Sequence, residues 1–189
     1  MTHSGLKSGA RILALASGPL NRNRSKTLLV GVVGRDSIIE GVLSSWVGID
    51  GEDGLRSIEA MLKKSRFNDG VRLISLNGIA IAGLNIVAPK KLEKDLNVKV
   101  ALITRNRPNR SRLIAALRSF SEREGVNFDD RIRVVERDTL KAKLINGLYV
   151  QADETVMAKN DMLKSAYTLL RIAHLIASGI SRGESSGRV

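Results

Sequence analysis

Two apolar segments of the sequence end in short polar turns, and the residues at those ends could form a site. The run ILALA ends at Ala16 and is followed by Ser17 and a Gly-Pro turn, and the run VRLISL is followed by Asn77 and a glycine. If both runs are parallel strands, their carboxyl ends meet at one sheet edge, where ligands bind in such folds. Paired carboxylates there would hold the divalent cations used in phosphodiester cleavage. The side chains present are a methyl group, a hydroxyl and an amide, and the alternative interpretation is two ordinary turns.

Arginines gather at the junction between another predicted strand and helix. The segment TRNRPNRSR contains four of them, and two lysines begin a second predicted helix. An arginine fork fits a phosphate, and the backbone N–H groups of a helix N-terminus add further donors. No aromatic residue alternates with these cations, so the sequence does not predict a groove that stacks single-stranded bases. The predicted phosphate contacts, for which a solvated charge run is the alternative, are Arg105, Arg107, Arg110, Arg112, Lys90 and Lys91.

The predicted C-terminal helix has one polar face. Arg171, His174, Ser178 and Arg182 are spaced 3, 4 and 4 residues apart and therefore share that face. His174 could be a general acid, a metal ligand or a phosphate contact, whereas a lone helical histidine is more often a hydrogen-bonded structural residue. The other histidine, His3, lies in the polar N-terminal lead-in. The sequence therefore predicts no zinc site.

Three acids could replace carboxylates that the strand ends lack. Asp50 and Asp53 follow the third predicted strand, and Glu184 follows the C-terminal helix. The structural alternative for Asp50 and Asp53 is capping of the next helix, because acids stabilise the positive end of a helix dipole.

The composition favours a globular protein with a polyanionic partner. The 189 residues include 31 Lys and Arg against 19 Asp and Glu, a formal charge of +12. Such an excess favours nucleic acid, an anionic membrane or an acidic protein. No segment approaches the roughly 20 apolar residues of a membrane span, and none is typical of a secretion signal. We expect a cytoplasmic protein with no membrane partner and, because cysteine is absent, no disulfide.

The order of apolar periods predicts an α/β domain with a mixed sheet. Three strands joined by short turns (11–16, 27–34 and 37–49) indicate an antiparallel N-terminal meander, followed by helix–strand units flanked by helices. Helices are predicted over 55–67, over 84–96 with Pro89 as the implied first residue, over 108–124, and over 155–181 with a break near Asn160 or Leu170. Strands are predicted over 71–76, 98–104, 132–136 and 144–151. The chain, 1–189, is predicted to be one domain with mobile ends at 1–10 and 183–189.

Four stretches resemble the archaeal endonuclease dU family, which is similar to endonuclease V. They are the first strand with its Ser-Gly-Pro end, GVLSSWVGIDGEDG, LNGIAIAGLNIV and the C-terminal RIAHLIASGISRGESSGR. The resemblance covers nearly the whole chain in order. It implies a ribonuclease-H-like fold and a metal-dependent endonuclease.

The chain departs from the family pattern where a metal-dependent nuclease needs acids. Family members typically carry Asp-Asp where this chain has Ala16 and Ser17, and Leu-Asp-Gly where it has Asn77. A further acid often stands at the position of Ala88. Neutral side chains bind Mg²⁺ poorly. The resemblance therefore implies a remnant cleft lined by Ala16, Ser17, Asn77 and His174, without a metal ligand set.

These observations leave three functional hypotheses. The first is an endonuclease dU-like protein of DNA repair or nucleic-acid metabolism that binds nucleic acid, DNA in preference to RNA, has lost or weakened nuclease activity and has no cofactor. Its binding surface would include the six cations above with Arg171 and Arg182. The second is an active Mg²⁺- or Mn²⁺-dependent endonuclease for deaminated or damaged DNA that uses Asp50, Asp53 or Glu184. The third is a non-catalytic subunit whose basic face binds an acidic protein.

Overall fold

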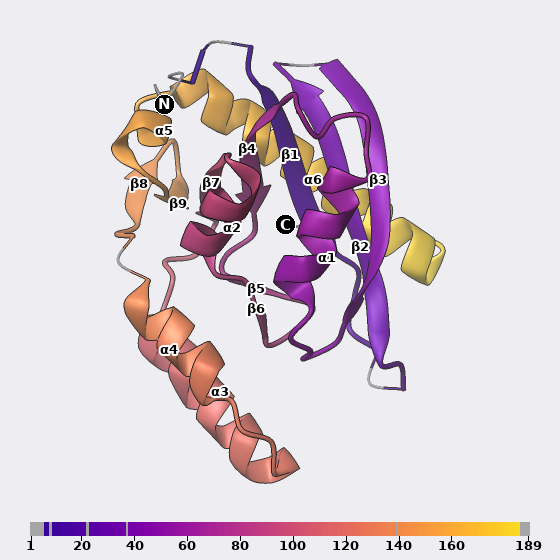
Figure 1. Cartoon of the computed structure of the whole chain (residues 1–189), viewed down its shortest axis with the longest axis vertical. Coiled ribbons are helices and arrows are strands. Elements are labelled where there is room, and N and C mark those ends of the chain that lie inside the picture. Colours follow the sequence, from indigo (N-terminus) through magenta and orange to yellow (C-terminus); the bar gives the residue numbers. More distant parts are fainter. Residues whose placement is uncertain (1–5, 8, 22, 37, 139, 186–189) are drawn as a thin grey trace.

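One mixed sheet forms the centre of the molecule (Figure 1). The computed structural model describes residues 6–7, 9–21, 23–36, 38–138 and 140–185. In this part of the chain the strand order is β3-β2-β1-β4-β7-β9-β8. The strands are β1 (Arg11–Ser17), β2 (Lys26–Arg35), β3 (Ile38–Gly48), β4 (Val71–Leu76), β7 (Lys99–Thr104), β8 (Lys143–Ile145) and β9 (Leu148–Gln151).

The predicted antiparallel meander is confirmed. β1 pairs with β2 and β2 with β3 in antiparallel fashion, whereas β4 runs parallel to β1 and β7 runs parallel to β4. The carboxyl ends of β1, β4 and β7 consequently lie along one edge of the sheet. This is the arrangement on which the predicted site depends.

Helices cover both faces of the sheet. α6 (Asn160–Arg182) crosses one face, and α1 (Gly54–Lys63) and α2 (Pro89–Leu96) lie on the other (Figure 1). β1 is buried on both sides because its residues alternate between the two cores: Ala14 and Ala16 pack toward α6, and Leu13 and Leu15 pack toward α1. On the α6 side, the small side chains of β1 pack against buried alanines of the helix. The helix and the sheet therefore approach closely.

A helical hairpin extends from the sheet domain as a separate arm. It consists of α3 (Arg110–Glu124) and α4 (Asp129–Arg137), and it projects well beyond the sheet (Figure 1). The prediction of a strand over 132–136 was wrong, because this segment lies inside α4. Its apolar residues Phe128, Ile132 and Val135 are spaced for one helical face and pack on Leu117 of α3.

Local signals explain the other differences from prediction. The helix predicted over 84–96 begins at Pro89, as that proline indicated, and Asn85–Ile86 forms a short strand, β6, with β5 (Ala80–Ile81). Segment 144–151 is the hairpin of β8 and β9, with positive φ angles at both residues of its Asn-Gly turn. The C-terminal helical region is divided into α5 (Glu154–Met157) and α6, which begins at Asn160, one of the two predicted break points.

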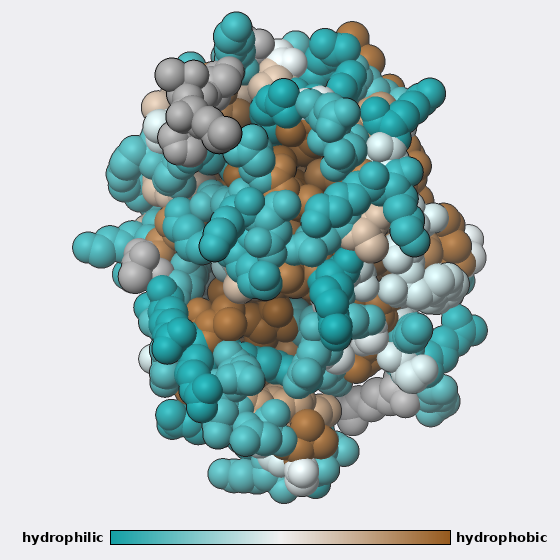
Figure 2. Space-filling view, in the orientation of Figure 1, coloured by the Kyte–Doolittle hydropathy of each residue, from teal (hydrophilic) through white to brown (hydrophobic). Residues whose placement is uncertain are grey.

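The surface of the body is mainly hydrophilic on the face shown in Figure 2, with apolar side chains along the side where β3 lies. Exposed apolar residues of β3 include Ile38, Val42 and Trp46. Among the described residues, every helix is too short or too polar to serve as a membrane span. Most of the predicted mobile ends, together with His3, lies outside the described residues.

Candidate nucleic-acid interface

The sheet edge brings together the two strand ends on which the predicted site depends. In the parallel pair of β1 and β4, Leu15 lies opposite Leu76, so Ala16 and Asn77 come next on the two neighbouring strands. Ala16 is only 7% exposed and packs toward α6, whereas Asn77 is exposed. These two positions, at which the resemblance implies acids, are therefore neighbours, and both side chains are neutral.

A short segment joins this edge to the loop that follows β3. The Ala82 N–H donates to Ser17 Oγ at 3.0 Å, and the Asp50 N–H donates to the carbonyl oxygen of Ala82 at 2.9 Å. Ala82 and Asp50 both have positive φ angles, 45° and 53°, which side chains other than glycine rarely adopt. The backbone of Ala82 thus connects the end of β1 with Asp50 and brings this acid near the cleft.

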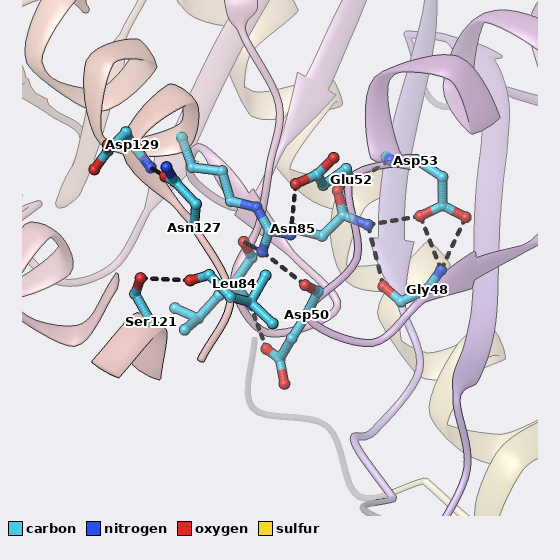
Figure 3. A network of polar contacts seen from close by, with 12 residues as sticks. Gly48, Asp50, Glu52, Asp53, Leu84, Asn85, Ser121, Asn127 and Asp129 are labelled. Carbon is cyan, nitrogen blue, oxygen red and sulfur yellow. Dashed lines mark hydrogen bonds and ion pairs between the residues drawn. The ribbon is translucent and has the colours of Figure 1, made fainter. Parts of the chain in front are cut away.

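Asp53 has a structural role that differs from the predicted one. It occupies the N-cap position of α1, but its carboxylate accepts hydrogen bonds from the Gly48 N–H at 3.0 and 3.1 Å instead of capping the helix. The buried Asn85, which is fully inaccessible, supplies the acceptor for the helix N-terminus: its Oδ1 accepts from the Gly54 N–H at 3.0 Å. Asn85 Nδ2 donates to Asp53 at 2.8 Å (Figure 3). Asp53 therefore holds β3 and α1 together.

Asp50 is held by one carboxylate oxygen and by its backbone. Its Oδ1 accepts from the Leu84 N–H at 2.7 Å, while its other oxygen points away from the residues drawn in Figure 3. Arg131 of α4 donates to the carbonyl oxygens of Asp50 and Leu84, at 2.6 and 3.1 Å, and stacks on Phe128. Arg131 and Asn85 thus fix this loop, and sequence reasoning missed both because their partners are distant in the chain.

The predicted arginine cluster begins at the same sheet edge. Arg105 and Arg107 follow β7, whose carboxyl end lies beside that of β4, and both are exposed. Arg105 Nε donates to the Tyr167 hydroxyl of α6 at 2.9 Å. Arg110 donates to a backbone carbonyl in the loop after α4, and Arg112 is exposed in the first turn of α3. These arginines form a basic path from the strand ends onto the arm.

The lysines of α2 differ from these arginines because acids neutralise them. Lys90 forms an ion pair with Glu93 at 2.9 Å, and Lys91 forms one with Asp95 at 2.6 Å. The hydrogen bond that Lys91 donates to Asp95, followed by the negative charge of Asp95, raises the pKa of Lys91. A phosphate would have to compete with these internal partners.

The polar face of α6 is present as the spacing indicates. His174 and Ser178 lie 3.5 Å apart between Nε2 and Oγ, which places the histidine in a contact within its own helix. Arg171 and Arg182 are exposed, and Glu184 is exposed just beyond the helix. No described hydrogen bond or ion pair links His174 or Glu184 to Ser17 or Asn77.

Comparison with known proteins decides the family. A match to the family described as endonuclease dU covers residues 8–181. The chain belongs to the endonuclease dU family. It is 32% identical to a UPF0215 protein of Methanosarcina mazei over 97% of this chain and 96% of that protein, and 32% identical to one of Pyrococcus furiosus over 96% and 97%.

Solved structures show the fold of this endonuclease dU family member. A protein of unknown function from Archaeoglobus fulgidus superposes with a TM-score of 0.77 at 24% identity, covering 90% of this chain and 98% of that one. The catalytic domain of human endonuclease V gives a TM-score of 0.54 at 11% identity, covering 94% and 84%. The fold is ribonuclease-H-like, as the resemblance implied.

The donor atoms of this endonuclease dU member do not fit a divalent cation. Hard cations take several oxygen ligands, of which carboxylates bind best. The strand ends supply Ser17 Oγ, which already accepts a hydrogen bond, and the neutral amide of Asn77. Asp53 uses both carboxylate oxygens elsewhere. Within the described ranges, no three His, Cys, Asp or Glu side chains converge as a metal site would require.

Proposed function

We propose that this protein binds nucleic acid through the carboxyl edge of its sheet and that its endonuclease activity is lost or weakened. The observation that carries the proposal is the adjacency of Ala16 and Asn77, both neutral, at positions where the family pattern has acids. The protein would act in DNA repair or nucleic-acid metabolism, with DNA preferred over RNA.

The arginine path supports the binding half of the proposal. Arg105 and Arg107 stand at the same edge as the neutral strand ends, and Arg112 continues the positive surface onto α3. Phosphate binding by arginine needs no metal ion. The solved endonuclease V of Ciona intestinalis, which shares the fold, is described in complex with DNA containing an inosine. Arg171 and Arg182 are proposed to extend the contacts along α6.

The missing acids support the other half. Loss of a metal-binding carboxylate costs several kcal/mol of transition-state stabilisation, on the order of a thousandfold in rate. The resemblance implies that Ala16, Ser17 and Asn77 together replace more than one such group. Binding should survive, because cations spread over a surface do not depend on these three side chains.

Restoration of the acids tests the proposal by gain of function. The double variant Ser17→Asp/Asn77→Asp is assayed first, because an aspartate at 17 can still accept the Ala82 N–H and Asn77 is exposed. Ala16→Asp is then added, since Ala16 is nearly buried. We expect Mg²⁺- or Mn²⁺-dependent cleavage of uracil- or inosine-containing DNA to appear or to rise at least about tenfold, whereas Asn146→Asp on the distant β8–β9 turn changes nothing.

The same assay separates the alternatives. Robust cleavage by the unaltered protein that Asp50→Ala abolishes would replace the proposal with an active nuclease using substitute ligands. Binding to DNA or RNA that weakens steeply with added salt supports a nucleic-acid partner. Absence of such binding would favour a subunit that contacts an acidic protein.

A further inference from the structure

A groove of about 330 Å³ lies beside the sheet edge, outside the cleft described above. It begins at Pro19 and Leu20, which follow Ser17 and Gly18 at the end of β1, and continues over the start of β2 to Trp46 of β3 and the end of α6. A Cβ at position 18 would lie 2.8 Å from Ser181 Oγ and 3.3 Å from the Ala177 carbonyl oxygen, so the end of β1 packs closely on α6. The volume of the groove is within the range of small-molecule sites, roughly 300–1,000 Å³.

Among the described residues, three cations line the groove and no acid does. Arg24, Lys26 and Arg182 are exposed, and none of them forms an ion pair among the described residues. They come from the β1–β2 turn, from β2 and from α6, so only the fold brings them together. An unneutralised group of this kind favours an anionic ligand.

Trp46 gives the groove an exposed aromatic surface. It is 56% exposed on the edge strand β3, opposite Leu28 of β2, and both residues line the groove. An indole ring beside cations offers a stacking surface for a base and charges for its phosphates. Sequence reasoning predicted no such groove, because Trp46 is about 20 residues from the nearest of these cations along the chain.

We propose that this groove binds an unpaired nucleotide of a single-stranded segment, with its base stacked on Trp46 and its phosphates on Arg24, Lys26 and Arg182. The inference rests on the proposed nucleic-acid binding and adds a substrate class: nucleic acid with a single-stranded or frayed stretch beside the cleft. A second copy of the chain is a poorer occupant, since each copy carries a charge of +12 and the groove holds no acid to pair with a neighbour's cations.

Trp46 is the only tryptophan in the chain, so its fluorescence reports directly on the groove. The full-length protein is titrated with a twelve-nucleotide oligothymidylate, its RNA equivalent, and an abasic strand of equal length and charge. We expect both base-containing strands to quench the emission, and the abasic strand to bind more weakly without comparable quenching. The DNA and RNA arms show which sugar is preferred.

Variants test the same contact by a second readout, the anisotropy of a labelled oligothymidylate. Trp46→Ala should weaken binding roughly 5- to 150-fold, the range expected for loss of base stacking, and Trp46→Phe should weaken it less. Val42→Ala is the matched control, because Val42 is 50% exposed on the same face of β3 but does not line the groove. Arg182→Gln should reduce the slope of log affinity against log salt by about 0.7.

Three outcomes would overturn the inference. Tight binding of oligothymidylate without quenching, and unaffected by Trp46→Ala, would place the strand elsewhere and leave the proposed function standing. Absence of binding by any of these single strands would contradict this inference, and absence of binding by duplex DNA as well would contradict both proposals. Emission that changes with protein concentration alone would show that a second copy covers Trp46.

Discussion

Replacement of Arg131 should destabilise the protein more than replacement of any other arginine on the arm. Its side chain is 9% exposed and joins α4 to the loop after β3. The substitution Arg131→Met keeps an unbranched apolar chain against Phe128 but removes the guanidinium. The carbonyl oxygens of Asp50 and Leu84 then lose their donor.

The expected loss follows from these contacts. Each hydrogen bond from a charged donor contributes about 1.5–3 kcal/mol, and the guanidinium centre 3.6 Å from the Phe128 ring adds about 1–2 kcal/mol. The ion pair with Glu52 adds little, because that side chain is 66% exposed. Methionine also relieves a penalty, since Arg131 Nε is buried without a partner. The net loss in unfolding free energy should be about 3 kcal/mol.

Urea unfolding measures this loss, with Arg133→Met as the control. Arg133 lies on the same helix, but its ion-pair partner Asp130 is 95% exposed, so the control should lose at most about 0.5 kcal/mol. The Leu84 amide, which donates to Asp50, should also exchange its hydrogen faster in Arg131→Met. Equal losses in the two variants would refute the conclusion that Arg131 fixes the junction of arm and cleft.

Three further predictions concern the same framework. Ala88→Asp should raise the unfolding free energy by about 1 kcal/mol, because Ala88 is the N-cap residue of α2 and its side chain cannot accept a capping hydrogen bond. Ala88→Val, which adds no acceptor either, should not raise it. Asn85→Ala should lower it by about 2–4 kcal/mol and reduce Tm, since the Gly54 N–H loses its buried acceptor. Burial raises the pKa of Asp153, but hydrogen bonds, led by that from Lys99, outweigh it and hold the pKa at about 2. Stability present above about pH 4 should therefore fall toward pH 2, and Asp153→Asn should flatten this dependence in acid unfolding curves.

The sheet could be predicted because its strands carry their signals locally. β2 is a continuous run rich in branched residues between polar turns, and the short connections on either side allow only antiparallel pairing. The juxtaposition of Ala16 and Asn77 followed from one rule, that parallel strands share a carboxyl edge. Local pattern and sheet geometry were enough for these features.

The arm and the groove depended on contacts that a linear sequence does not display. Ile132 and Val135 lie close enough together to fit a short strand, and only packing on α3 distinguishes the helix. Trp46 and Arg182 come from opposite parts of the chain, and α6 brings them to one groove. Asn85 has the capping role expected of Asp53 for the same reason. It is distant in the sequence, but its side chain accepts the hydrogen bond from the N-terminus of α1.

The two halves of the proposed function depend on the structure in different ways. Metal-assisted cleavage needs a few anionic oxygens at fixed positions. Neutral residues at Ala16, Ser17 and Asn77 can therefore remove it while β1 and β4 remain paired. In the proposal, phosphate binding is shared among arginines on separate elements, so that loss of any one would remove only part of the affinity. A nuclease fold can therefore lose catalytic activity through substitutions at one sheet edge and still bind a nucleic-acid strand. Restored acids should consequently bring back cleavage while leaving the salt dependence of binding nearly unchanged.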